Sequence, residues 1–280
     1  MKKGVCYAIF WATVLMLLFG CGGSGGSGGG SGTLSMNITD AKPVIPGDPV
    51  ELWITFEDVL VHKPGGGWIS LPLPETPLTI NLLAFQDGDT TELVTPVEID
   101  SGKYTQVRFV LSSAQIVTSA AAQEILDTMD LDVPSGTLRT DKNFTFQVDD
   151  GAAVDLTVDF DLSQSIVATG SSEFKLKPVL HLNETQVAAT ICGSINAGSF
   201  GVSEKAIITV IEDSNGETYT EVTVTRDSDT DPTEFCIFWL VPEQDYTVEI
   251  DTDEDGSAEF VVAVSADDLE PGEELNIGTF

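Results

Sequence analysis

The chain offers few groups for chemistry, and the densest set is a run of acids near its C-terminal end. The stretch Asp251-Thr-Asp253-Glu-Asp255-Gly256-Ser-Ala-Glu259 carries carboxylates at alternate positions before a glycine. This spacing converges oxygen atoms on one hard cation, as in calcium-binding loops, although Val262 stands where an EF-hand has its bidentate glutamate. Asp251, Asp253, Asp255 and Glu259 are therefore candidate calcium ligands, and an acidic hairpin turn is the alternative. No other cofactor is expected.

Cys21 is the second residue with a chemical role that its neighbours indicate. It follows Leu18-Phe19-Gly20 at the end of an apolar run. This series resembles the bacterial lipobox, in which the cysteine is acylated on sulfur and becomes the new N-terminus. The resemblance implies that Cys21 is the lipidation site, and an ordinary signal peptide with an incidental cysteine is the alternative.

The remaining cysteines predict a disulfide. Cys6 lies inside the apolar run, so Cys192 and Cys236 are the pair left in an exported body. An even pair in an exported domain favours one disulfide over two buried thiols. It would close a loop of about 45 residues and contribute roughly 3–4 kcal/mol.

Catalytic residues are not expected, and we expect the protein not to be an enzyme. Outside the Gly/Ser segment the chain has no G-x-S-x-G elbow, H-E-x-x-H pair, P-loop or G-x-G-x-x-G. His62 and His181 are its only histidines. Asp155, Asp159 and Asp161 share one side of a predicted strand, which resembles a carboxylate pair for glycoside hydrolysis, but regular alternation predicts a solvated face. Trp68, in a glycine-rich turn, is a candidate for stacking on a carbohydrate, with core packing as the alternative.

The first 32 residues predict export and tethering. Lys2 and Lys3 precede an apolar run from Val5 to Phe19 that is too short to span a bilayer, so residues 1–20 read as a lipoprotein signal peptide. Residues 21–32 follow as a lipidated cysteine and a flexible Gly/Ser linker, whose eleven Gly and Ser residues would span about 18 Å. A glycine after Cys21 favours the outer membrane by resemblance to Gram-negative lipoproteins.

The charge excludes some partners. Removal of Lys2 and Lys3 leaves 45 acidic against 10 basic residues, a net charge of −35. Such a polyanion does not bind nucleic acid, because phosphate backbones require clustered Lys and Arg. The charge also changes along the chain: residues 33–182 hold 22 acids and 8 bases, whereas residues 183–280 hold 23 acids and 2 bases. This step predicts a domain boundary near residue 183.

Hydrophobic alternation predicts an all-β fold of two β-sandwich domains, Ig-like or prealbumin-like. The alternation of apolar and polar residues is strictest from Val154 to Leu162, which predicts a half-buried strand. One short helix is expected at Ala120–Met129, inside a loop of the first domain. In residues 183–280 about seven short strands are expected, with tight turns at Asn215-Gly216 and Asp255-Gly256, as suits a sandwich. The strands predicted in the two domains are Leu52–Val61, Lys103–Leu111, Phe144–Val148, Phe174–Leu182, Ala189–Ile195, Lys205–Glu212, Thr218–Thr225, Phe235–Leu240, Tyr246–Asp251, Ala258–Val264 and Leu275–Thr279.

Residues 33–182 also resemble a bacterial family, the domain of unknown function 4382. The resemblance rests on local patterns that occur in order: Gly32-Thr33-Leu34, Ile38-Thr39-Asp40-Ala41, Val59-Leu60-Val61-His62, Gly66-Gly67-Trp68, Ile80-Asn81-Leu82-Leu83, Gly102-Lys103-Tyr104-Thr105, Val133-Pro134-Ser135-Gly136, Val158-Asp159-Phe160-Asp161 and Leu176-Lys177-Pro178-Val179. It implies a secreted or lipid-anchored bacterial β-domain without an assigned activity. Through Phe235–Leu240, Val241-Pro242 and Tyr246-Thr247-Val248, residues 187–280 resemble, more diffusely, the prealbumin-like (carboxypeptidase-regulatory-like) sandwich modules.

These expectations combine into a non-catalytic, lipid-anchored protein of the bacterial cell envelope, on the periplasmic or surface face of the outer membrane. We expect a structural, adhesive or ligand-binding surface module, held to the membrane by its lipid, with a protein or polysaccharide partner. The alternative is a calcium- or carbohydrate-binding module that serves an envelope enzyme or adhesin. Calcium titration separates the two, because binding to the folded state must stabilise it.

Overall fold

The computed structural model describes residues 29–40, 49–86, 88–119, 126–131, 133, 136–140, 144–168, 174–177 and 179–280. The signal segment 1–20, Cys21 and the linker up to Gly28 lie outside these residues. Regular structure in the described residues is β, apart from one helical turn, α1 (Leu162–Ser165), and the 3-10 turns η1 (Leu82–Ala84), η2 (Ala197–Ser199) and η3 (Ala266–Asp268). The all-β prediction is confirmed. Among the described residues, no helix has the length and apolar character needed to cross a membrane.

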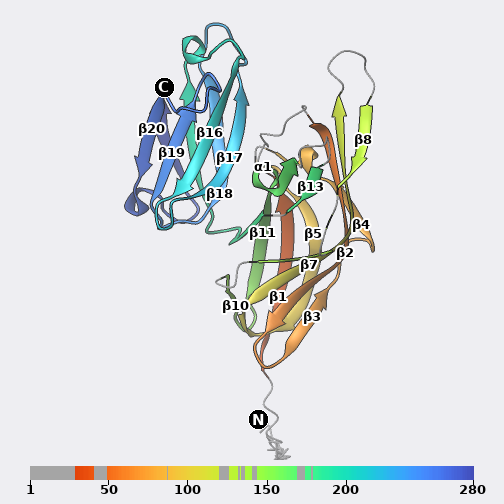
Figure 1. The fold of residues 1–280 in the computed structure, drawn as a ribbon. Coiled ribbons are helices and arrows are strands. Elements are labelled where there is room, and N and C mark those ends of the chain that lie inside the picture. Colours follow the sequence, from red (N-terminus) through yellow and green to blue (C-terminus); the bar gives the residue numbers. More distant parts are fainter. Residues whose placement is uncertain are drawn as a thin grey trace, which may run out of the picture.

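The N-terminal part, residues 29–184, contains two sheets that share one core (Figure 1). The first sheet has the order β14 (Val179–Glu184), β11 (Ala153–Asp161), β1 (Ser31–Thr39) and β5 (Thr91–Asp100), and β1 runs parallel to β11. The second has the order β3 (Gly67–Leu71), β2 (Pro49–Lys63), β7 (Gln106–Ser119) and β8 (Leu126–Asp130), with β4 (Leu78–Asn81) on β2 and β9 (Thr137–Arg139) on β7. Two short pairs complete it: β6 (Gly102–Tyr104) with β10 (Phe146–Val148), and β12 (Ile166–Ala168) with β13 (Phe174–Leu176).

The C-terminal part, residues 189–280, contains seven strands, as predicted. They form one sheet of β18 (Thr233–Leu240), β15 (Ala189–Ile195) and β21 (Glu274–Thr279), and a second of β17 (Glu217–Thr225), β16 (Lys205–Glu212), β19 (Tyr246–Asp251) and β20 (Phe260–Val264). The predicted turns at Gly216 and Gly256 join hairpins β16–β17 and β19–β20.

Alternation of apolar side chains explains both cores. In β1, Leu34, Met36 and Ile38 are all fully buried, and the residues between them are half-buried. This is the period of two that puts alternate side chains on one face of a strand. The buried apolar residues form two separate clusters, one drawn from residues 34–182 and one from residues 189–269.

The predicted helix at Ala120–Met129 is wrong for its second half. Leu126–Met129 belong to β8, which pairs antiparallel with the end of β7, while residues 120–125 lie outside the described residues. Strand pairing gives the backbone groups of β8 that face β7 their partners across the hairpin, and the Gln115 side chain also donates to Asp130 Oδ1 at 2.7 Å. These tertiary partners outweigh the weak helical preference of an Ala-rich segment.

The predicted linker also ends earlier than residue 32. Ser31 and Gly32 are the first residues of β1, opposite Asp100 and Ile99 of β5. A Cβ on Gly32 would stand 2.6 Å from Val148 Cγ1 and 2.7 Å from the Ala152 carbonyl oxygen. Gly32 therefore permits a close approach of strands, and the hydrogen-bonded ladder offsets the entropy that glycine loses on ordering.

The predicted disulfide is confirmed. Cys192 on β15 and Cys236 on β18 stand directly opposite each other, with Cα atoms 4.1 Å apart and a sequence separation of 44 residues. The bond joins the first strand of the C-terminal part to the strand that, as described below, faces the N-terminal part. It therefore constrains the loop that contains β16 and β17.

Replacing both Cys192 and Cys236 by alanine should lower the free energy of unfolding by about 3–4 kcal/mol, because the unfolded chain regains the entropy of a closed 44-residue loop. Urea denaturation of the variant and of the wild type measures the difference. Dithiothreitol should destabilise the wild type by a similar amount and leave the variant unchanged. An unchanged midpoint in the variant would contradict a stabilising role.

Candidate functional site

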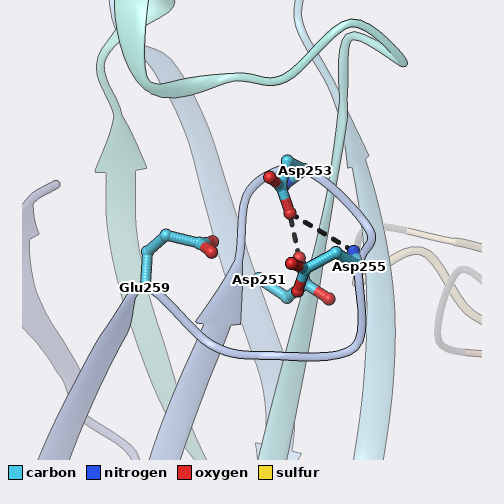
Figure 2. A group of neighbouring side chains, drawn as sticks. All are labelled: Asp251, Asp253, Asp255 and Glu259. Carbon is cyan, nitrogen blue, oxygen red and sulfur yellow. Dashed lines mark hydrogen bonds between the residues drawn. The ribbon is translucent and has the colours of Figure 1, made fainter.

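The four predicted calcium ligands lie together at one end of the C-terminal part. Asp251 ends β19, Asp253 and Asp255 follow in the loop, and Glu259 precedes β20 (Figure 2). One carboxylate oxygen from each lies within 4.8 Å of the corresponding oxygens of the other three. Hard cations such as calcium take carboxylate oxygens as ligands. The loop therefore has a donor set of suitable chemistry, brought together by a hairpin turn.

Backbone groups already hold these carboxylates in place. Asp251 Oδ1 accepts from the amides of Asp253 and Glu254 at 3.2 and 2.7 Å, and its Oδ2 accepts from Gly256 at 2.8 Å. Glu259 Oε2 accepts from Thr252 N and Oγ1 at 2.7 and 3.0 Å. These hydrogen bonds would also stabilise an acidic hairpin turn that binds no ion, so they are consistent with that alternative. Local desolvation, then the carboxylates of Asp255 and Glu259, raise the pKa of the Asp253 carboxyl.

Trp68, the predicted stacking residue, is half-buried and has neighbours on its ring. The Arg108 guanidinium carbon lies 3.8 Å from the ring centroid, and the His62 ring lies 5.1 Å away. A cation over an indole face is itself a stabilising contact. Trp53 is more exposed, at 36 %, and lines an open groove with Leu78 and Phe85. Trp68 stays a candidate for stacking on a carbohydrate. Trp53 is a second candidate, because it lines an accessible groove.

The two parts of the chain contact each other along α1, β14, β17 and β18 (Figure 1). Gln164 Nε2 of α1 donates to the carbonyls of Thr218 and Tyr219 at 3.0 and 3.1 Å. The His181 ring of β14 stacks on Tyr219 with centroids 4.1 Å apart. Asn183 Nδ2 donates to the Trp239 carbonyl. This junction is a site that sequence reasoning did not predict.

The junction buries carboxyl groups, and this overturns the prediction of a solvated face on β11. Asp159 and Asp161 are 2 % and 0 % exposed, and Asp40 at the end of β1 is 2 % exposed, whereas Asp155 is half-buried. The alternation of β11 correctly indicates one core face. It does not reveal that a second part of the chain covers the other face. A covering element distant in sequence leaves no signal in the strand itself.

Asp40 has an electrostatic environment that opposes ionisation. Burial, and next the nearby charge of Asp159, raise the pKa of the Asp40 carboxyl well above its usual value. Hydrogen bonds from the Leu162 amide, at 3.2 Å to Oδ1, and from Gln86 act in the opposite direction, and Asp161 adds to the rise. His181 is affected in the opposite sense, because burial lowers the pKa of its imidazole. Both groups therefore favour their neutral forms.

Asp40→Asn should stabilise the protein near pH 8 and have little effect near pH 4. A raised pKa means that the native state holds a proton more tightly than the unfolded state, so stability falls as pH rises from about 4 through the native pKa. Asparagine keeps an oxygen for the Leu162 amide and carries no charge. Melting temperatures from about pH 4 to about pH 8 should show a gain of a few degrees at the alkaline end only. A gain of equal size at every pH would contradict the assignment.

Solved structures give only distant likenesses to the whole chain. A Bacillus anthracis TIE protein is 10% identical, with 89% of this chain covered and a TM-score of 0.22, and the chain spans 33% of its length. The fimbrial anchor protein Mfa2 from Porphyromonas gingivalis is 9% identical over 82% of each chain, with a TM-score of 0.21. An adhesin from Mobiluncus mulieris with intramolecular cross-links is 10% identical, covering 90% of this chain and 99% of its own, with a TM-score of 0.22. Scores this low carry no argument about fold or function.

Sequence families give a firmer result. No curated protein matches the chain. Residues 31–178, more than half of the chain, match the model of the family described as domain of unknown function (DUF4382). The matched range begins at the first residue of β1 and ends just before β14. The chain therefore belongs to the DUF4382 family.

Proposed function

We propose that the protein is a non-catalytic lipoprotein of the bacterial cell envelope, which acts as a structural, adhesive or ligand-binding surface module. Cys21 carries the lipid, Gly22 favours the outer membrane, and a protein or polysaccharide is the partner. The proposed division is into a first domain, 33–182, and a prealbumin-like second domain, 183–280. Two separate hydrophobic clusters support this division.

The course of β1 is the observation that carries the proposal. Near its start, Gly30 and Ser31 accept hydrogen bonds from Ser101 and Gly151 at 2.7 Å each. At its other end, Asp40 lies against the C-terminal part. Nine residues of strand extend over about 30 Å. A tether at the start of β1 therefore holds the C-terminal part at the distal end of the body, where a partner can reach it.

The histidines support a non-catalytic role. His62 Nδ1 lies 3.1 Å from Thr105 Oγ1 beside the Trp68 ring, and His181 is stacked on Tyr219 inside the junction. Neither contacts a serine or cysteine nucleophile in the part of the chain that the structure describes. Both side chains are used to pack β elements together.

Cys21→Ser should abolish anchoring. Without the sulfur that receives the acyl chain, the protein should move from the detergent phase to the aqueous phase when cells are extracted with Triton X-114. Cys6→Ser is the matched control, since that residue lies within the signal segment, and it should leave the partition unchanged. Detergent partition that persists in Cys21→Ser would refute the lipid anchor.

A calcium-binding module, which serves an envelope enzyme or adhesin, is the second candidate function, and a carbohydrate-binding module is its variant. The convergence of Asp251, Asp253, Asp255 and Glu259 within 4.8 Å favours calcium. The open groove beside Trp53 and the ring of Trp68 are the surfaces on which a sugar would stack. Calcium at this loop would neutralise part of the repulsion among its carboxylates.

Millimolar calcium should raise the melting temperature of the wild type, because binding to the folded state stabilises it. The double variant Asp253→Asn, Asp255→Asn should lose this rise. As a control, Asp267→Asn with Asp268→Asn removes the same number of exposed charges from η3 in the same part, and the rise should remain. Equal calcium responses in all three proteins would exclude this loop as the site.

A further inference from the structure

An exposed tryptophan stands on the outer face of the second sheet in the N-terminal part. Trp53 of β2 is exposed, and its indole Nε1 donates to Glu51 Oε2, two residues earlier on the same strand, at 2.8 Å. This bond orients the ring on the surface and gives its one polar atom an acceptor. The indole therefore offers an apolar ring face to a ligand without leaving a polar group unsatisfied.

Two amide side chains flank Trp53 across the sheet. The strands β4 and β7 lie on either side of β2 (Figure 1), and Trp53 is in register with Asn81 of β4 and with Gln115 of β7. Directly opposite residues of neighbouring strands put their side chains on the same face of the sheet. The row of amide, indole and amide therefore spans two strand spacings, about 10 Å.

Each amide is held by one of its polar atoms and presents the other. Asn81 Oδ1 accepts from the Leu52 amide at 3.0 Å, and Gln115 Nε2 donates to Asp130 Oδ1 at 2.7 Å. A backbone N–H requires an acceptor and a carboxylate requires a donor, so both amide orientations are fixed. Asn81 Nδ2 and Gln115 Oε1 have no hydrogen-bond partner among the described residues. A donor and an acceptor thus stand on opposite sides of the indole.

A row of hydroxyl groups runs beside this first row. Thr79, Thr55 and Ser113 lie two residues along β4, β2 and β7 from the side chains of the first row, so they share its face. Thr55 Oγ1 lies 3.0 Å from Thr79 Oγ1 and accepts from Ser113 Oγ at 3.0 Å. Hydroxyls and amides both donate and accept hydrogen bonds. The face therefore suits a ligand that is itself rich in hydroxyl groups.

Charge and size narrow the class of ligand. Neither row contains a charged side chain, and the charged groups beside them are acidic: Glu51 and Asp130 are bonded to the first row, and Glu92 lines the groove next to Trp53. Like charges repel, so these acids disfavour uronic acids and sulfated sugars. The groove measures about 610 Å³, within the range of ligand sites, and the first row is wider than one sugar ring. A neutral chain of several sugars fits both features.

We propose that this face binds a neutral oligosaccharide, with one sugar ring stacked on Trp53 and the hydroxyls of the adjoining rings bonded to Asn81 Nδ2 and Gln115 Oε1. The C–H groups of the ring pack on the indole, and its hydroxyls replace water at the two amides. The proposal rests on the ligand-binding role proposed above and gives the carbohydrate variant a ligand class and a site. It requires neither the lipid on Cys21 nor calcium at the acidic loop.

Isothermal titration with four neutral hexasaccharides tests the ligand class: cellohexaose, laminarihexaose, mannohexaose and xylohexaose. The purified full-length protein is kept in Triton X-100, which has no sugar headgroup. At least one of the four should bind, and about tenfold or more tightly than hexagalacturonic acid, which carries a carboxylate on every ring. Absence of heat with all four, or an affinity for hexagalacturonic acid within tenfold of the best neutral chain, would overturn the proposal.

Three variants locate the binding of the best hexasaccharide. Trp53→Ala should weaken it about tenfold or more, because the stacking surface is lost. Asn81→Asp keeps an oxygen for the Leu52 amide but removes the donor, and it should also weaken binding about tenfold. Trp68→Ala, the matched control, removes the tryptophan under Arg108 and should leave the affinity unchanged. Melting temperatures show that each variant is folded.

Unaltered affinity in folded Trp53→Ala would refute the site. Loss of binding in Trp68→Ala instead would also refute it, while the carbohydrate-binding module proposed above would stand on the other tryptophan. None of these outcomes changes the detergent partition that tests anchoring or the calcium response of the acidic loop.

Discussion

The burial of β11 on both faces is the constraint on which the rest of the structure depends. One face packs into the N-terminal core through Leu156, Val158 and Phe160. The other face would be solvated in an isolated sandwich, but Asp159 and Asp161 are buried there. Buried carboxyls require hydrogen bonds or a covering partner of matched chemistry. The C-terminal part covers this face. The two hydrophobic cores are separate, but the position of one part therefore depends on the other.

The contacts at the junction also suit a highly acidic protein. The C-terminal part carries 22 acids and 2 bases, and ion pairs with a similarly acidic N-terminal part would be few. Gln164 and Asn183 instead donate to backbone carbonyls, and His181 stacks on Tyr219. Such neutral contacts are short-ranged and depend little on salt. The two acidic parts repel each other electrostatically, and they are therefore held together by interactions that ionic strength does not weaken.

The sequence predicts local β structure well, because alternation is a local property. The strands β15, β16 and β19 have the predicted bounds, and the hairpin turns lie at the predicted glycines. The Cys192–Cys236 bond was predicted because these are the two cysteines that lie beyond the predicted signal peptide and lipidation site. The helix predicted at Ala120–Met129 is wrong for Leu126–Met129 because these residues pair with the end of β7 in a hairpin, and helical preference alone does not reveal that pairing. The junction was missed for a different reason: Asp40 and Phe235 are far apart in the sequence and are close only after both parts have folded and met.

The parallel pairing of β1 with β11 has a mechanical consequence. β1 lies between β11 and β5, and hydrogen bonds to both strands run along almost its whole length. A force applied between the start of β1 and a partner bound to the C-terminal part acts along the axis of β1. The hydrogen bonds that β1 makes to its neighbours are then loaded in shear, and many of them must break together instead of one by one. β1, the first strand of the described residues, is thus also well placed to resist tension.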